Sequence, residues 1–396
     1  MDGDFKVHRE FARRLVTGNF LYQDGMHAPY PVFWALFHIP ALLLPLPLAK
    51  ALLYPLGVGA MVALIALLHL LVKPHLPPRH GELFWIVTFT AFLASRYLLR
   101  DLAELGVNTF IVMLSWLSVY LWIKHREWLA GASLGLATAL KCTPAIFILF
   151  FIWKRQWKMV FVSLLFAGLF TLSPVLMQGS NGYSVHMGNW ISSVWTGFFG
   201  KDPSVGTIGP EALQNMALRP TLARYLMHLP PDHPGRAQHP LYMDFLDLSA
   251  EAASVVIKII LGSIIVVALW WWRKPVLNRN NPLLLWELAG VSLLLLLYSP
   301  LTWGQHCVSV VPACYLISSE VIVRGGLSRW MWGLVAGWIL LVLVFNREVV
   351  GKSMHWLLQS YHLETFCIIA LLAVVIGCWR QTAISLQRVG RAVAQK

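Results

Sequence analysis

Long apolar runs constrain this chain more than any other feature of its sequence. A helix must span roughly 30 Å to cross the hydrocarbon core of a membrane, which takes about 20 apolar residues. Runs near this length recur along the whole chain, at 50–72, 83–99, 108–123, 159–177, 251–272, 283–299, 307–322, 330–346 and 364–379. They do not alternate as membrane β-strands do. The sequence therefore predicts an all-α, polytopic membrane helical bundle with about nine full spans.

The composition agrees with this prediction. Hydrophobic residues make up 58% of the chain and charged residues only 12%, whereas a soluble domain carries about 25% charged residues. This excludes a soluble enzyme, a disordered protein and a coiled coil. Many of the 19 Trp residues stand at the ends of apolar runs, where an aromatic belt would meet the membrane surface.

The positive charges lie mainly between the apolar runs. The formal net charge is +13, but no nucleic-acid-binding motif accompanies it, so we expect membrane lipids and no nucleic acid as partners. By the positive-inside rule, short basic connections face the cytoplasm. They are Lys73–Glu82, Lys124–Glu127, Lys154–Lys158, Arg273–Asn281, Arg324–Arg329 and the tail from Arg380. The opposite side then receives residues 1–31, about 98–107, 178–250, 300–306 and 347–363.

Residues 128–153 lie between two basic connections and are too short for two full spans. A re-entrant pair of half-helices that breaks around Lys141 and Pro144 would return the chain to the same side, because proline ends a helix. Broken backbone is tolerated at membrane depth where it lines protein or a cavity. The alternative is one ordinary span, which would put one basic connection on the wrong side.

Two extracytoplasmic loops are predicted from this topology. Residues 1–31 form the first, and they carry basic residues that are hard to translocate unaided, so we expect an upstream signal-anchor span in the natural reading frame. Residues 178–250 form the second, which is too long for a mere connection. Its Trp, His and Pro residues indicate a folded loop over a site.

Four polar residues on the predicted outer side are candidates for chemistry. Asp4 would be a general base near the membrane surface, or else a solvated terminal charge. Arg100 would bind phosphate, or else snorkel to the interface. Lys141 is an ionisable residue at membrane depth, which indicates function, and His306 would act as acid, base or phosphate donor. No phosphate-binding Gly-rich loop and no metal-ligand spacing is present, so a lipid-borne donor fits better than a soluble nucleotide.

The motifs around these residues resemble a known family. They are Gly3-Asp4-Phe5, Arg100-Asp101-Leu102, Leu105-Gly106-Val107-Asn108, Ala139-Leu140-Lys141-Cys142-Thr143-Pro144 and Ser299-Pro300 with Trp303 and His306. The arrangement resembles the GT-C class of membrane glycosyltransferases, and within it glycosyltransferase family 87, the polyprenyl-phosphate-mannose-dependent mannosyltransferase type. In two places the chain departs from the family pattern, at Val107 (usually Gln) and at Ala217 (usually Ser).

The resemblance implies that residues 1–396 form one GT-C transmembrane domain in a bacterial plasma membrane, with the site facing outside. It implies inverting transfer of a hexose, which is mannose in this family type, from a polyprenyl-phosphate sugar to a lipid-linked or glycolipid acceptor. Asp4 would be the catalytic base. The donor phosphate or sugar would be bound by Arg100, Lys141, His306, Asn215 and Arg219. No cofactor or metal is expected. Asp2 and Asp4 do form an Asp-x-Asp pair, which could bind a divalent ion.

Two other classes of protein remain alternatives at this stage. A polytopic transporter or lipid flippase would show an internal repeat and polar residues along the membrane midplane. A glycan ligase or polymerase would carry paired Arg and His in a large outer loop, and Arg219, Arg224 and His228 keep this alternative open.

Overall fold

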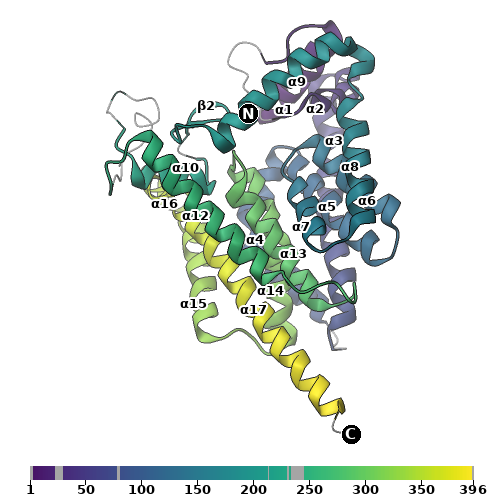
Figure 1. Ribbon diagram of the computed structural model, residues 1–396, viewed down its shortest axis with the longest axis vertical. Helices are drawn as coiled ribbons and strands as arrows, with labels where there is room; N and C mark the ends of the chain where they lie inside the picture. Colours follow the sequence, from purple (N-terminus) through teal and green to yellow (C-terminus); the bar gives the residue numbers. More distant parts are fainter. Residues whose placement is uncertain are drawn as a thin grey trace.

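The computed structural model describes residues 3–22, 30–77, 81–212, 214–229, 232 and 245–394, with the backbone only at 3–4 and 389–394. The described chain is mostly helical, as predicted, and its one sheet is a two-stranded antiparallel hairpin (Figure 1). The first half comprises α1 (Gly3–Thr17), α2 (Val32–Phe37), η1 (Ile39–Leu43), α3 (Leu46–Val72), η2 (Lys73–His75), α4 (Glu82–Ala103), α5 (Val107–Ile123), α6 (Glu127–Leu140), α7 (Ala145–Trp153), α8 (Trp157–Leu172) and α9 (Val175–Phe199). The second half comprises β1 (Val205–Gly206), β2 (Gly209–Pro210), α10 (Leu218–Leu226), α12 (Ala250–Trp271), α13 (Pro282–Tyr298), η3 (Gly304–Val310), α14 (Val311–Val323), α15 (Arg329–Trp338), the π-helical η4 (Ile339–Val344), α16 (Arg347–Ser360) and α17 (Leu363–Ala394).

Fewer helices are long enough to cross a membrane than the sequence predicted. Five helical segments are long and apolar enough to cross a membrane, namely α3 with η2, α4, α12, η3 with α14, and α17. The number rises to seven if two bent helix pairs each count as one span. Predicted spans 108–123 and 283–299 correspond to α5 and α13, which have 17 residues each and reach only about 26 Å at 1.5 Å per residue. The prediction of nine full spans is therefore not confirmed.

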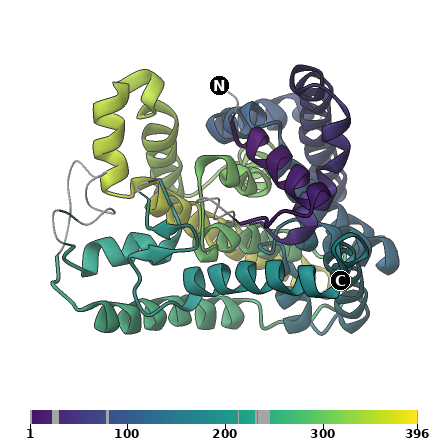
Figure 2. The ribbon, with the colours of Figure 1, turned by 90° about the horizontal axis from the view of Figure 1, so that it is seen from above.

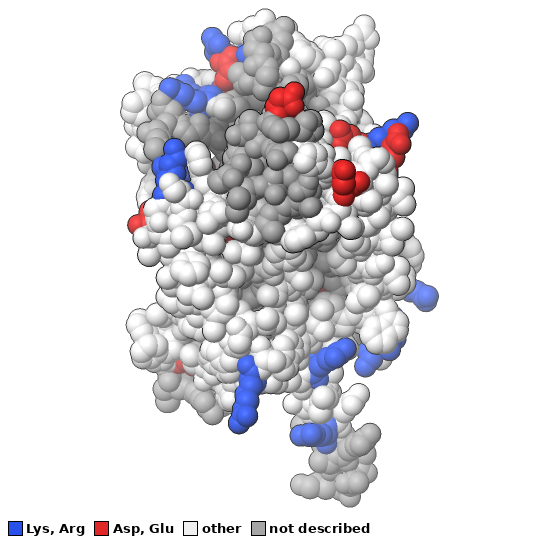
Figure 3. Space-filling view, turned by 90° about the vertical axis from the view of Figure 1, so that its left-hand side faces the viewer, with Lys and Arg blue, Asp and Glu red and all other residues white. Residues whose placement is uncertain are grey.

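The predicted basic connections gather at one end of the molecule. The guanidinium of Arg279 donates to the Trp122 carbonyl and to Glu127, and Lys158 pairs with Glu127 at 3.6 Å. The Arg324 connection also lies at this end, because Arg324 lines a crevice together with His75 after α3 and Pro282 at the start of α13. On the face drawn in Figure 3, Lys and Arg mark this lower end, and a band almost without charge lies above it.

Helices α6 and α7 have the geometry of the predicted half-helix pair. The helix stops at Leu140 and starts again at Ala145. The start of α6 and the start of α8 lie side by side, because Trp122 donates to Gln156 at 3.3 Å and Lys158 contacts Glu127. The chain therefore enters and leaves this pair at the basic end, and the break at Lys141 lies away from that end.

The opposite end is covered by helices that bend away from the bundle. Pro174 follows the last turn of α8, and α9 leaves at 89° to it. Likewise α16 bends by 99° from α15 and η4, and the Asn346 side chain caps its first turn. Figure 2 looks along the long axis and shows α9 lying across this end. Much of the predicted outer loop 178–250 is thus helical, and α1 supplies a helix in the predicted loop 1–31.

Small residues allow α6 to pack directly on α8. A Cβ atom added at Gly131 would lie 2.5 Å from a Val162 methyl group, and one at Gly135 would lie 2.7 Å from the Ala167 nitrogen. Such small-residue contacts let two membrane helices approach closely. This contact fixes the half-helix that ends at Lys141.

We expect Gly135→Ala to destabilise the protein, because the methyl group would meet backbone atoms of α8 that cannot move aside. Overpacking of this kind typically costs about 1–3 kcal/mol. Gly168→Ala is the matched control, because a Cβ there meets nothing within 4 Å. Thermal unfolding of both variants in detergent tests this, and equal melting temperatures would contradict the packing argument.

Candidate active site

Lys141 stands at the break between α6 and α7, with its backbone in an extended conformation. Its side chain is buried, and its ammonium donates to the Asn108 Oδ1 atom at 3.0 Å. The same ammonium lies 6.0 Å from the centre of the Tyr30 ring. A charge held this far from water requires polar partners, and the partner at Asn108 is itself held in place.

Asp101 fixes the orientation of Asn108. This fully buried carboxylate, near the end of α4, accepts from the Asn108 amide nitrogen at 2.9 Å and from the Asn108 backbone at 3.3 Å. It also accepts from the Thr109 backbone at 2.8 Å and the Thr109 hydroxyl at 2.7 Å. These bonds satisfy orphan N–H groups at the start of α5. Because the Asn108 nitrogen faces Asp101, its oxygen must face Lys141.

A cavity of about 450 Å³, including its mouth, lies next to Lys141. Asn108, Thr302 and His306 supply polar groups to its wall. Its other walls are mainly apolar and come from α5, α7 and α13, through residues that include Ile111, Val112, Trp116, Phe147, Leu295 and Leu296. The cavity thus places a buried cation beside a surface between helices that is mainly apolar by area and that several Ser and Thr residues also line.

His306 reaches this cavity from the turn between α13 and η3. Its Nδ1 atom lies 3.2 Å from the Trp303 backbone nitrogen and 3.1 Å from the Leu301 carbonyl oxygen, so the turn itself orients the ring. The imidazole is also stacked on the Trp303 indole. Among the described residues, Nε2 has no hydrogen-bond partner. The structure therefore brings the predicted residues Lys141 and His306 to one cavity.

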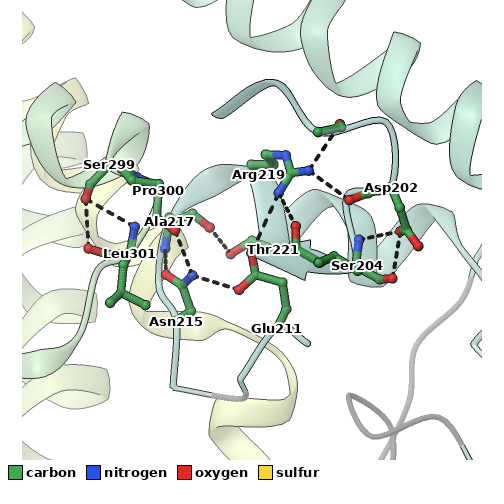
Figure 4. A network of polar contacts seen from close by, with 12 residues as sticks. Asp202, Ser204, Glu211, Asn215, Ala217, Arg219, Thr221, Ser299, Pro300 and Leu301 are labelled. Atoms are coloured by element: carbon green, nitrogen blue, oxygen red, sulfur yellow. Dashed lines mark hydrogen bonds and ion pairs between the residues drawn. The ribbon is translucent and has the colours of Figure 1, made fainter. Parts of the chain in front are cut away.

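Asn215 ties the large loop to the turn that carries His306 (Figure 4). This fully buried side chain donates to the Pro300 carbonyl at 3.2 Å and to Glu211 at 2.9 Å. Its oxygen accepts from the Thr302 backbone at 2.9 Å. Asn215 therefore positions the turn and does not line the cavity beside Lys141.

Arg219 lies further from that cavity and organises the large loop. Its guanidinium donates to three loop carbonyls, at Gly200, Asp202 and Val205, over 2.9–3.3 Å, and lies 3.7 Å from the Glu211 carboxylate. Three of these contacts are hydrogen bonds from Nη1 and Nη2 of the guanidinium to the loop. As a substrate ligand, Arg219 stays a prediction.

Arg100 lies at the rim of the region. Its side chain is 59% exposed and its closest ionic partner is Glu104, at 3.9 Å. Its aliphatic part lies against Gly304 in the outer turn, 3.6 Å from the place of a Cβ atom there. Arg100 therefore packs on the turn that carries His306, but it does not line the cavity.

A cluster of rings from α1 and α2 lies beside Lys141. The Trp34 indole donates to the Nδ1 atom of His8 at 3.1 Å, and Tyr30 stacks on Trp34 with ring centres 4.2 Å apart. Burial lowers the pKa of His8 well below its ordinary value, and the neighbouring His38 and Lys141 lower it further. His8 is thus neutral at pH 7, with its proton on Nε2.

Asp4, the predicted base, lies in α1 one helical turn before His8. Its side chain lies outside the described part of the chain, as does Asp2. Within the described residues, no group of three or more His, Cys, Asp or Glu side chains is arranged to hold a metal ion.

Comparison with known proteins assigns the family. The sequence model of Glycosyltransferase family 87 matches residues 29–300 of this chain. The chain belongs to glycosyltransferase family 87. It is therefore a glycosyltransferase, as the motifs around Lys141 predicted, and the family assignment argues against the transporter alternative.

Two relatives are similar to this family 87 member over most of its length. One is a polyprenol-phosphate-mannose-dependent alpha-(1-2)-phosphatidylinositol mannoside mannosyltransferase of Mycolicibacterium smegmatis (strain ATCC 700084 / mc(2)155), 25% identical over 94% of this chain and 83% of that protein. The other is a polyprenol-phosphate-mannose-dependent alpha-(1-2)-phosphatidylinositol pentamannoside mannosyltransferase of Mycobacterium tuberculosis (strain CDC 1551 / Oshkosh), 26% identical over 80% of this chain and 63% of that protein. No solved structure matches the chain.

Sequence reasoning missed two parts of this family 87 site. Asp101 and Asn108 were recognised only as motif residues. Asp101 stands just before the Gly106 turn, at a distance along the chain from which a carboxylate can cap the helix that follows. His8 was not singled out, yet it stands four residues after Asp4, which places both positions on the same face of a helix. Both the Asp101–Asn108 spacing and the Asp4–His8 spacing are visible in the sequence and could have been used to predict these contacts.

Glu211 gives a pH-dependent test of the loop. Burial raises its pKa from 4.5 to about 7, and the Asn215 hydrogen bond and Arg219 only partly offset this. The folded protein therefore holds a proton between pH 4.5 and about 7 that the unfolded chain has lost. The stabilisation is fully present below pH 4.5 and is lost as pH rises through about 7. The rise of about 2.5 pKa units corresponds to about 3–4 kcal/mol at about 1.4 kcal/mol per unit.

Glu211→Gln should accordingly flatten the fall in melting temperature between pH 5 and 8. The exposed Glu251→Gln is the control and should retain the slope of the wild type. Thermal unfolding in detergent across this pH range is the measurement. An unchanged slope in Glu211→Gln would assign the titration to another group.

Proposed function

We propose that this glycosyltransferase moves mannose from a polyprenol-phosphate-mannose donor to a hydroxyl group of a glycolipid acceptor. The names of both relatives specify such a donor and a phosphatidylinositol mannoside acceptor. The buried Lys141 ammonium, on the wall of a cavity whose surface is mainly apolar, is the observation that carries the proposal. Such a site suits a leaving group that combines a phosphate with a long hydrocarbon chain.

The phosphate would lie between Lys141 and His306. Negative charge develops on it as the bond to the sugar breaks, and a cation fixed in advance stabilises that charge most effectively in a site without bulk water. Asp101 and Asn108 serve as positioning residues, because Asp101 orients the Asn108 amide and the amide oxygen accepts from Lys141. The apolar wall formed by α5, α7 and α13 would receive the first isoprene units.

The base in this proposal is Asp4. The acceptor hydroxyl oxygen forms a bond to the anomeric carbon while the bond from that carbon to the phosphate oxygen breaks. The hydroxyl proton passes to the Asp4 carboxylate, and polyprenyl phosphate departs as the anion. A single displacement inverts the anomeric configuration. Asp4 shares its helix face with His8, and His8 lies within electrostatic range of Lys141, which supports this placement.

The site would face the outside of a bacterial plasma membrane. The described parts of the basic connections around Arg279, Lys158 and Arg324 lie at the opposite end, and basic connections stay in the cytoplasm. Residues 1–31 and 178–250 then form the outer loops over the site, within one transmembrane domain that extends over residues 1–396.

The ligase or polymerase alternative has one observation in its favour. The Arg224 guanidinium contacts the Nε2 atom of His362 at 3.2 Å, so an Arg–His pair does exist under the large loop. Thr221 bonds the other ring nitrogen of His362 at 3.0 Å, which makes this pair part of the packing between α10 and α17. The family assignment favours transfer of a single sugar.

Asp4→Asn should abolish detectable sugar transfer, because an amide cannot accept the acceptor proton. The assay supplies labelled polyprenyl-phosphate mannose and a mannosylated glycolipid to membranes that contain matched amounts of each protein. Asp2→Asn should retain activity. Loss in both variants, together with inactivation by a chelator, would instead assign the Asp-x-Asp pair to a metal ion.

Lys141→Met should lower kcat by roughly 10²–10³, in line with the loss of one donor to a developing oxyanion. Exposed Lys201→Met is the control and should behave as the wild type does. A variant that raises KM for the donor at unchanged kcat would show that Lys141 only binds the ground state.

A further inference from the structure

A second and larger cavity lies at the basic end, opposite to the candidate active site. It measures about 1000 Å³ including its open mouth, of which about 400 Å³ admits water. Its walls come from the connection between α12 and α13, the first turns of α13 and the last turns of α17. The lining residues are Lys154, Lys274, Pro275, Asn278, Asn281, Glu287 and Gln387, with the apolar Val276, Leu277, Leu283, Leu284, Ala383 and Leu386.

A buried ion pair forms the inner wall of this cavity. The Lys154 ammonium lies 2.7 Å from the Glu287 carboxylate, with side chains only 1% and 3% exposed. The same ammonium donates to the carbonyls of Trp272 and Lys274 at 2.7 and 2.9 Å. Lys154 is thus held by two carbonyl groups and one carboxylate of the protein. A carboxylate has about four acceptor sites, so Glu287 can still accept from a ligand.

The outer part of the cavity has the opposite character. Lys274 is exposed at its rim and lies within electrostatic range of Glu287. The Asn278 oxygen accepts from the Asn280 backbone at 2.8 Å, and the Asn281 oxygen accepts from the Leu283 backbone at 3.0 Å. Both amide nitrogens are thereby left as donors without a partner among the described residues. The start of α13, at Pro282, adds the positive end of a helix dipole.

We propose that this cavity binds the headgroup of a phospholipid that carries both a phosphate and a primary amine. The phosphate would lie between Lys274 and the amides of Asn278 and Asn281. The ammonium would point inward to Glu287, which accepts its hydrogens. Along the cavity, a cation lies at the rim and the Glu287–Lys154 ion pair lies inside. The phosphate of the headgroup would therefore face Lys274, and its ammonium would face the acceptor positions of Glu287 that Lys154 does not occupy.

Apolar side chains beside the mouth favour a lipid over a free phosphate ion. Leu277 is 94% exposed and Leu386 is 43% exposed, and both line the cavity. Exposed leucines at the end of a membrane bundle suit contact with acyl chains. The site would thus hold a lipid of the cytoplasmic leaflet, on the far side of the bundle from Lys141.

The test uses the delipidated full-length protein in detergent. We expect phosphatidylethanolamine to raise the melting temperature and to be retained in native mass spectra more strongly than phosphatidylcholine or phosphatidylglycerol. The first of these competitors has no N–H donor and the second has no amine. Inorganic phosphate is the fourth arm. Equal effects of the three lipids, or an effect of inorganic phosphate alone, would overturn the proposal.

Variants assign the effect to this cavity. Lys274→Ala and Asn278→Ala should each weaken phosphatidylethanolamine binding about tenfold or more, as expected for a lost charge-assisted hydrogen bond. Lys274 is exposed at the rim, so the Lys274→Ala protein without lipid should melt as the wild type does. Asn278→Ala also loses the bond to the Asn280 backbone, so its lipid effect is measured against its own melting temperature without lipid. Arg273→Ala is the matched control, because Arg273 stacks on Trp270 and does not line the cavity. Retention of wild-type affinity in Lys274→Ala and Asn278→Ala would refute the site. No step of the test depends on sugar transfer.

Discussion

The hydrogen bond from Lys141 to Asn108 joins two breaks in the helical bundle, and the candidate site depends on it. One break ends α6 at Leu140, and the other is the turn between α4 and α5. An ammonium in a low-dielectric interior is costly unless it is hydrogen-bonded. Here the compensation comes from an amide that a buried carboxylate, Asp101, holds in one orientation. The ammonium is therefore fixed before substrate binds, and reorganisation during the reaction is small.

The rest of the fold holds this arrangement from two sides. The close packing of α6 on α8 sets the depth of Lys141. The Asn215 side chain ties the large loop to the turn that presents His306. Lys141 comes from the half-helix pair and His306 from the turn after α13. Each side chain can therefore be positioned by its own contacts. The loop and the half-helix pair act as supports for one cavity.

The sequence was sufficient for the parts of this structure that follow from local chemistry. A lysine beside Pro144 between two basic connections predicted the half-helix pair, and the polar turn before His306 predicted a residue at the cavity. The number of spans was harder to predict, because α5 and α13 are helices too short to cross alone and proline bends α9 away from α8. The surroundings of Arg219 were not readable, since its partners are backbone carbonyls of a loop that has no sequence signal.

The two ends of the bundle use buried charge in different ways. At the basic end, the Lys154 ammonium and the Glu287 carboxylate form an ion pair at 2.7 Å. At the other end, the Lys141 ammonium donates to the Asn108 amide, which the Asp101 carboxylate holds in one orientation. Lys154 therefore faces a carboxylate directly, whereas Lys141 contacts an amide on the wall of the cavity that His306 also lines.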